Sequence, residues 1–158
     1  MRANATVVNI SMIVFWFFVL LGCNRAEQEI VVVPSGYIDR VLIVYDQADG
    51  ADPLYREGKR VHIIPSNGIL KTKMSPNPGW IGTPEFYKDT ILANRRFLYE
   101  SDPRKLPVDA VVAYGGSAGY TTVKNQEIRF LEYYIGNKAQ IDSAYEETQK
   151  LDFRKLIR

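Results

Sequence analysis

One short segment of this 158-residue chain has the spacing of a hydrolase nucleophile. Residues 115–119 (GGSAG) match G-x-S-x-G, in which the serine, here Ser117, stands on a sharp turn between a strand and a helix. The following residues, 120–123, are rich in β-forming side chains and do not predict that helix. The base would have to be His62, the only histidine, which lies upstream. We therefore expect no catalytic residue here and interpret the three glycines as a flexible turn.

Residues that could bind a metal are few and scattered. Zinc sites use three or four Cys, His or carboxylate ligands, whereas this chain has one Cys and one His. His62 lies on the same side of its segment as Arg60 and Ile64, which favours a surface or packing role. The acidic residues of 46–57 could offer oxygen ligands to calcium, but their spacing is not that of a helix–loop–helix site. We expect no metal and no cofactor, and a solvated turn at 46–57.

The single cysteine carries the clearest chemical prediction. Arg2 is the only charged residue before Cys23, and the stretch from Ile10 to Leu21 is uncharged and mostly apolar. A membrane-spanning helix needs about 20 apolar residues, whereas the apolar part of a secretory signal peptide has about 7–15. The stretch ends in Leu20, Leu21 and Gly22. A secretory leader is the favoured interpretation, and an uncleaved short anchor with a free thiol is the alternative.

The last residues of this leader indicate how it is processed. Leu20-Leu21-Gly22-Cys23 resembles the bacterial lipobox, and the resemblance implies recognition by the lipoprotein signal peptidase and acyl chains on Cys23. Several chains on one residue hold a protein more firmly than the marginal anchoring by a single chain. Because there is no second cysteine, a disulfide within the chain is excluded.

These features predict three segments of the chain and a cellular location. Residues 1–22 are expected to be a lipoprotein signal peptide, 23–28 the lipidated cysteine and a tether, and 29–158 one β-rich domain. The expected location is the extracytoplasmic side of a bacterial membrane. Asn24 is not the aspartate that resembles an inner-membrane retention signal, which favours the outer membrane if the source is Gram-negative. With 20 Lys+Arg against 18 Asp+Glu, the charge balance predicts no nucleic-acid partner.

Short apolar segments separated by turn residues predict a mainly β, sandwich-like single domain with one C-terminal α-helix. The expected strands are 29–34, 40–45, 60–64, 69–73, 85–88, 97–99, 109–114 and 126–135. Asn67-Gly68 predicts a hairpin between 60–64 and 69–73. The change in apolar parity between Phe130 and Leu131 indicates a bulge or burial on both faces. Asn137 and Gln140 have the spacing of a capping box at the start of the helix.

Several phrases of the sequence occur together in a known order. They are Val33–Tyr37 (VPSGY), Arg40–Tyr45 (RVLIVY), Ile64–Thr72 (IPSNGILKT) and Tyr133–Lys138 (YYIGNK). Their order resembles an uncharacterised domain family found in small bacterial lipoproteins, over roughly Ile30 to Tyr145. The shared motifs are turn and strand signals, so the resemblance implies a fold and no catalytic residues. The first half is similar to the front of a transthyretin-like sandwich.

The composition and the leader together favour a binding or structural module of the cell envelope over an enzyme. Trp80 lies in a loop with three prolines, with Phe86 and Tyr87 just beyond, and these aromatics are the expected contact site for a protein or an envelope polymer. The alternative for them is a fold back onto the sheet edge. Two other functions stay open: an immunity or inhibitor lipoprotein against a toxin, and a small envelope enzyme that uses carboxylates.

Overall fold

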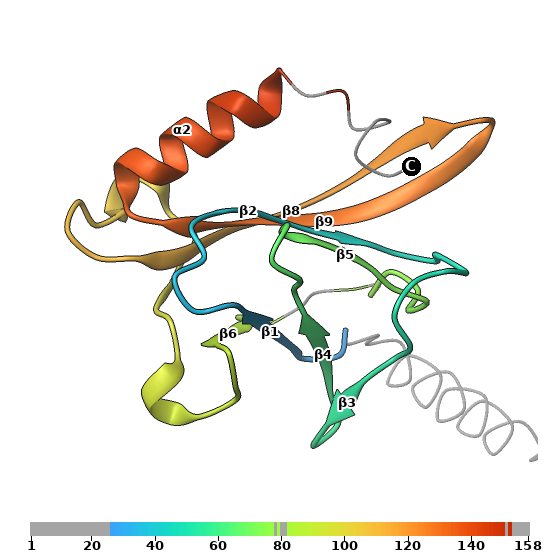
Figure 1. The fold of residues 1–158 in the computed structure, drawn as a ribbon, viewed down its shortest axis with the longest axis horizontal. Helices are drawn as coiled ribbons and strands as arrows, with labels where there is room; N and C mark the ends of the chain where they lie inside the picture. Colours follow the sequence, from blue (N-terminus) through green and yellow to red (C-terminus); the bar gives the residue numbers. More distant parts are fainter. Residues whose placement is uncertain (1–25, 78, 80–81, 151, 153–158) are drawn as a thin grey trace, which may run out of the picture.

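The computed structural model describes residues 26–77, 79, 82–150 and 152, and within them the chain forms two β-sheets and one α-helix (Figure 1). The first sheet has the order β3-β4-β1-β6. Its strands are β1 (Glu29–Val33), β3 (Tyr55–Arg56), β4 (Lys59–Ile63) and β6 (Glu85–Lys88). The second sheet has the order β5-β2-β9-β8-β7. Its strands are β2 (Asp39–Val44), β5 (Ile69–Lys71), β7 (Tyr99–Glu100), β8 (Val112–Val123) and β9 (Gln126–Gly136).

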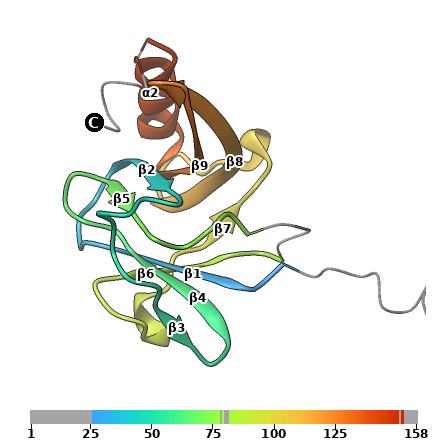
Figure 2. The same ribbon diagram turned by 90° about the vertical axis from the view of Figure 1, so that its right-hand side faces the viewer.

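The main core lies between the two sheets. Val31 and Val33 of β1 and Phe86 of β6 pack there against the inward side chains of the second sheet. The second sheet contributes Val41, Ile43, Ala113, Leu131, Tyr133 and Ile135. Figure 2 shows the two sheets as separate layers, with the helix on the far side of the larger one. The prediction of a mainly β sandwich with a C-terminal helix is confirmed.

Strand β1 is an inner strand of the smaller sheet, and all five of its residues are buried. It pairs in parallel with β4 on one side and with β6 on the other. Its alternate residues Ile30 and Val32 pack on the outer face of the sheet, in a cluster with Val61 and Tyr87. A strand buried on both faces reads as a continuous apolar run, which is why EIVVV was recognisable from the sequence.

Helix α2 (Lys138–Gln149) forms a third layer on the larger sheet. Its buried residues Ile141 and Ala144 pack against Tyr134 of β9. The Asn137 side chain accepts a hydrogen bond from the Gln140 backbone N–H, and the Gln140 side chain accepts one from the Asn137 N–H, at 3.0 and 2.9 Å. The predicted capping box is therefore confirmed. The helix also explains why β9 has apolar residues on both faces. Tyr134 faces α2, while Leu131 faces the other sheet.

The predicted hairpin between residues 60–64 and 69–73 is wrong, although its turn exists. Gly68 has φ +75°, and its N–H donates to the Pro65 carbonyl over 2.9 Å. The chain nevertheless changes sheet within this turn. The Ile64 N–H donates to Val32 of the first sheet, and Leu42 of the second sheet donates to the Gly68 carbonyl, each at 2.8 Å. The five-residue connection 64–68, which includes a proline, leaves room for such a crossing.

The glycine segment 115–119 is not a turn between elements, which corrects a second prediction. It lies inside β8, opposite β9, where the register shifts between Gly115 and Ser117. Gly115 and Gly116 have φ values of +98° and +120°, which other residues rarely adopt. The glycines therefore form a β-bulge, a device that bends a strand and increases its twist. The reversal follows at Lys124-Asn125, both with positive φ, and joins β8 to β9 in an antiparallel hairpin.

The predicted strand boundaries hold for 29–34, 40–45, 85–88 and 126–135 to within a residue. The strand predicted at 109–114 begins only at Val112, and the one predicted at 97–99 is β7, two residues further on. The segment 46–57, predicted as a solvated turn, contains the short edge strand β3. Among the described residues, no helix is long and apolar enough to cross a membrane.

Candidate functional site

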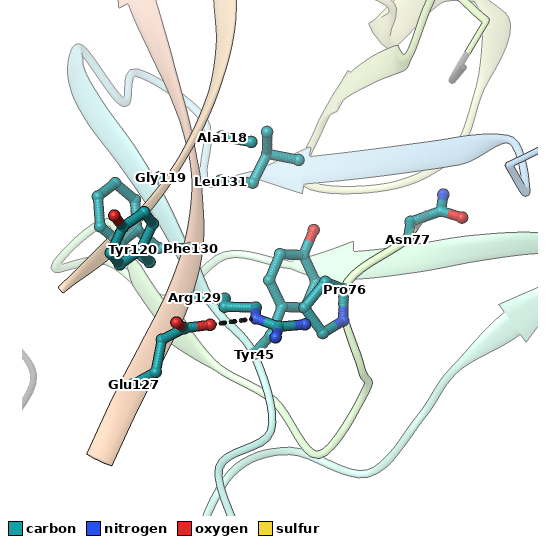
Figure 3. Close-up of a pocket in the computed structure, with 10 residues that line it drawn as sticks. All are labelled: Tyr45, Pro76, Asn77, Ala118, Gly119, Tyr120, Glu127, Arg129, Phe130 and Leu131. Carbon is teal, nitrogen blue, oxygen red and sulfur yellow. Dashed lines mark hydrogen bonds and ion pairs between the residues drawn. The ribbon is translucent and has the colours of Figure 1, made fainter. Parts of the chain in front are cut away.

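A hollow of about 260 Å³ lies under the projecting end of the β8–β9 hairpin (Figure 3). Its walls come from β8 and β9, from Tyr45 just after β2, and from the loop before β6. The lining residues are Tyr45, Pro76, Asn77, Ala118, Gly119, Tyr120, Glu127, Arg129, Phe130 and Leu131. Most of the lining surface is apolar. Ligand pockets are typically concave and apolar with a few placed polar groups, so this hollow is the candidate functional site.

The projecting hairpin makes the hollow. Figure 1 shows β8 and β9 running on past the strands of the smaller sheet. Deep in the sandwich, Leu131 and Tyr133 of β9 pack on that sheet. Nearer the turn, Glu127 and Arg129 continue the same face of β9, and they pair with one another at 2.7 Å. Near the turn, the face of the hairpin that points toward the smaller sheet is therefore opposed by Tyr45 and by the Pro76–Asn77 loop.

Asn77 fastens the start of the domain to the edge of the hollow. Its side-chain oxygen accepts the Glu27 N–H over 3.0 Å, and its amide donates to the Glu27 carbonyl over 2.7 Å. The same amide donates to the Glu29 carboxylate over 3.0 Å. Arg60 adds a salt bridge from its Nε to the Glu27 carboxylate and a hydrogen bond from Nη1 to the Ser75 carbonyl. We call Glu27, Asn77 and Arg60 the tether clamp.

Glu29 and His62 form a buried polar pair behind the clamp. Their side chains are 0% and 1% exposed, and Glu29 Oε1 lies 3.9 Å from His62 Nε2. Within the part of the chain that the structure describes, Glu29 Oε2 and His62 Nε2 have no hydrogen-bond partner. Buried polar atoms without partners are rare and costly. The expectation that His62 is a surface or packing residue is resolved in favour of packing, since its ring also meets the edge of Tyr45 at 6.3 Å between centroids.

Two tyrosines next to this pair stay protonated. Burial raises the pKa of Tyr45, and the nearby Glu29 carboxylate raises it further. Burial likewise raises the pKa of Tyr133, again with Glu29 as the leading charge effect. Both effects disfavour a second negative charge beside Glu29. The Tyr45 hydroxyl, at the wall of the hollow, is therefore a neutral group that can both donate and accept a hydrogen bond.

Removing the Asn77 side chain should destabilise the domain. Asn77→Ala leaves a buried oxygen of Glu29 without its donor and frees the backbone of Glu27. An unsatisfied buried group costs about 1–3 kcal/mol, so we expect the free energy of unfolding, measured by urea denaturation, to fall by about 2–3 kcal/mol.

The control for this prediction is Asn67→Ala, which removes one exposed side-chain bond to the Ile69 N–H. It should cost about 1 kcal/mol or less. Equal losses in the two variants would contradict a special role of Asn77 in the tether clamp.

The predicted contact residues are not in this site. Phe86 and Tyr87 are strand residues of β6 with 1% and 8% exposure. The prediction of a contact role for them is wrong, because the strand β6 turns Phe86 into the core and Tyr87 into the apolar cluster on the outer face of the smaller sheet. Trp80 lies outside the described residues. So do Cys23 and the residues Leu20, Leu21 and Gly22 before it, and the predicted signal peptide stays a prediction.

The other residues considered for chemistry, Ser117 and the acidic residues of 46–57, do not form a site either. Ser117 is an exposed residue of β8, followed by more strand and not by the helix of a nucleophile elbow. The acidic residues of 46–57 have different partners. Asp46 accepts from the Ser75 hydroxyl at 2.6 Å, and Asp52 pairs with Lys73 at 2.8 Å. Among the described residues, no three His, Cys, Asp or Glu side chains come together as metal ligands would.

Sequence reasoning missed the hollow because its residues come from four separate segments. Tyr45 was visible only as the end of an apolar strand, and Asn77 only as part of a proline-rich loop. One signal was available: residues 120–123 and 126–135 are both β-forming and are separated by two residues, the length of a tight hairpin.

Comparison with known proteins places the chain in a family. Residues 25–144 match the family described as "Family of unknown function (DUF6843)", and because this is most of the sequence, the chain belongs to that family. The resemblance to an uncharacterised family, expected over roughly Ile30 to Tyr145, is confirmed. No curated protein matches the chain.

One solved structure shares the fold. It is the crystal structure of a candidate lipoprotein from Bacillus anthracis, with a TM-score of 0.51 and 15% sequence identity. The similarity covers 71% of each chain. At this level of identity the likeness concerns the fold alone. The more specific expectation of a transthyretin-like arrangement stays a prediction.

Proposed function

We propose that this chain is a lipoprotein, held by acyl chains on Cys23 at the outer side of a bacterial membrane, and that its domain is a binding module. The observation that carries the binding role is the hollow under the β8–β9 hairpin. It is mainly apolar, it has a few polar groups at defined places, and the tether clamp fixes it to the start of the domain.

The leader supports the address. A short uncharged stretch ending in Leu20-Leu21-Gly22-Cys23 has the length of a signal peptide. A lone thiol outside the cell would be exposed to oxidation, whereas acylation removes it. Asn24 favours the outer membrane if the cell is Gram-negative. In this proposal the domain meets its partner, a protein or an envelope polymer, within a short distance of the bilayer.

A second candidate function is a small envelope enzyme, and the buried Glu29–His62 pair is the observation that favours it. A carboxylate and an imidazole with unused hydrogen-bonding atoms resemble an acid–base pair. Both side chains are closed off from solvent, however, and Asn77 holds the carboxylate. A structural pair is therefore the better interpretation. An immunity or inhibitor role is a variant of the binding proposal in which the partner is a toxin.

The address is tested on the native protein. Mass spectrometry of the purified chain should find the N-terminus at Cys23 with acyl chains attached. Labelled palmitate should enter the wild-type protein, and Cys23→Ser should abolish both the label and the cleavage, because the chain has no other cysteine. The Cys23→Ser variant should keep residues 1–22 and therefore have a higher mass than the processed wild type. A bare thiol on an uncut wild-type leader would overturn the anchor.

The binding role is tested by affinity capture from detergent-solubilised membranes. Wild type should retain a stoichiometric partner, and Ala118→Phe, which fills the hollow from β8, should lose it. Ser117→Phe is the matched control, since it adds the same ring one residue away on the opposite face of the strand. Capture that is equal in all three would place the contact elsewhere on the domain. Turnover of an envelope polymer that depends on Glu29 and His62 would favour the enzyme.

A further inference from the structure

The polar group best placed to recognise a ligand is the Tyr45 hydroxyl. The Tyr45 side chain is 4% exposed, yet it lines the hollow. Figure 3 shows its hydroxyl end turned into the space between the other lining residues. None of the described residues hydrogen-bonds this hydroxyl. A neutral hydroxyl at an apolar wall is satisfied when a ligand, or water, offers it a partner.

The size of the hollow limits what it can hold. About 260 Å³ is slightly below the range for small-molecule pockets, which is about 300–1,000 Å³. One ring or a short alkyl chain fills such a space. The apolar side chains that would touch it are those of Leu131, of Ala118 opposite it on β8, and of Pro76.

The charges around the hollow favour a neutral ligand. Arg129 and Glu127 at the rim neutralise each other through their ion pair. Behind Tyr45, the buried Glu29 carboxylate disfavours an anion. On the other side, the Arg60 guanidinium is occupied by the Glu27 carboxylate and the Ser75 carbonyl. Glu29 itself is 0% exposed, so among the described residues no unpaired charge is exposed at the wall of the hollow.

The tether clamp sets the distance between the hollow and the membrane. Asn77, at the wall, binds the backbone of Glu27. Cys23 is four residues before Glu27, and an extended chain spans at most about 3.6 Å per residue, so at most about 14 Å separates them. The polar headgroup layer of a bilayer is itself about 5–7 Å thick on each side. A domain tethered this closely samples molecules dissolved in that layer.

We propose that the partner bound in the hollow under the β8–β9 hairpin is a small neutral amphiphile from the membrane surface, in place of a protein or polymer segment. Its ring or short alkyl chain lies against Leu131 and Pro76, and its single hydroxyl or carbonyl group bonds the Tyr45 hydroxyl. The source of the ligand rests on the proposed function, because it needs the anchor at Cys23. The recognition chemistry rests on the hollow alone.

The experiment uses the full-length chain in lipid nanodiscs and two probes, 4-fluorophenol and fluorobenzene, followed by their ¹⁹F resonances. Empty nanodiscs correct for probe dissolved in the lipid. We expect 4-fluorophenol to bind more tightly than fluorobenzene, since only the phenol can bond Tyr45. Tyr45→Phe should weaken 4-fluorophenol binding about threefold to tenfold, the worth of one neutral hydrogen bond, and leave fluorobenzene unchanged.

The matched variants test the location. Ala118→Phe should abolish binding of both probes, and Ser117→Phe should leave both unchanged, with equal melting temperatures as evidence of folding. Binding no greater than in empty nanodiscs, or binding unaffected by Ala118→Phe or Tyr45→Phe, would overturn the proposal. Tighter binding of N-acetyl-tyrosinamide than of 4-fluorophenol would also overturn it, because the hollow would then take a protein side chain.

The two proposals can fail separately. If Cys23 is bare but the probes bind as expected, the anchor and the membrane source fail while the ligand site stands. If Cys23 is acylated but the probes do not bind, the ligand site fails while the lipoprotein stands.

Discussion

The Phe86→Ala variant is expected to lose about 3–5 kcal/mol of its free energy of unfolding, the usual cost of removing a buried phenylalanine ring. Phe86 is 1% exposed in the core between the sheets. Its ring stacks on Tyr99 with 5.8 Å between centroids and meets the edge of Tyr133 at 4.9 Å. Such aromatic pairs are worth about 0.5–1.5 kcal/mol each beyond the burial of area.

Urea denaturation measures this loss, and Tyr55→Ala is the control. Tyr55 belongs to the same sheet but is 50% exposed on the edge strand β3. Its removal should cost about 1 kcal/mol or less, because half of its surface is already in water. A loss for Phe86→Ala as small as that for Tyr55→Ala would contradict the burial of Phe86 and would restore it to the contact site that the sequence alone suggests.

The misassignment of Phe86 and Tyr87 has a physical reason. Aromatic residues are common both in cores and at interfaces, so the residue type does not distinguish the two environments. The position of the strand in the sheet distinguishes them. Glu85–Lys88 was predictable as a strand from its β-forming residues, but not as a neighbour of the fully buried β1. That pairing covers Tyr87 on one face and Phe86 on the other.

Local elements were predictable because local chemistry determines them. The capping box at Asn137 uses bonds within three residues, and β9 shows its two buried faces as a dense apolar pattern. The bulge in β8 was not predictable, since three glycines in 115–119 fit a turn as well as a strand bend. Its identity depends on β9 across the sheet.

The candidate site was the least predictable part. The register of β8 on β9, the pairing of β2 with β9 and the backbone bond from Asp46 to Met74 bring the walls of the hollow together. The lipidation prediction is different in kind. It depends on a few adjacent residues before Cys23, and so it needs no tertiary structure at all.

A second large effect is expected at the turn where the chain crosses between sheets. Gly68→Ala should lower the free energy of unfolding by about 2–5 kcal/mol. A non-glycine residue at positive φ costs about 1–2 kcal/mol, and a forced contact typically costs about 1–3 kcal/mol more. An added Cβ at Gly68, where φ is +75°, would lie 2.6 Å from the Arg40 carbonyl oxygen and would collide with the Tyr37 hydroxyl.

The Tyr37 side chain cannot easily move away. Its hydroxyl donates to the same Arg40 carbonyl, and burial raises the pKa of Tyr37 to about 12. The Gly68 carbonyl in turn accepts the Leu42 N–H at 2.8 Å. Besides urea denaturation, hydrogen exchange at the Leu42 amide should therefore report the change, with reduced protection in Gly68→Ala.

Gly36 provides a control with the same backbone strain and no collision. Its φ is also +75°, and an added Cβ would meet nothing within 4 Å. Gly36→Ala should thus cost only the conformational part, about 1–2 kcal/mol. The difference between the two variants measures how closely the second sheet approaches the turn. In a simple hairpin Gly68 would stand in solvent as Gly36 does, and the two losses would be equal. Equal losses would therefore return the chain to the β-hairpin interpretation and would contradict the crossing between sheets.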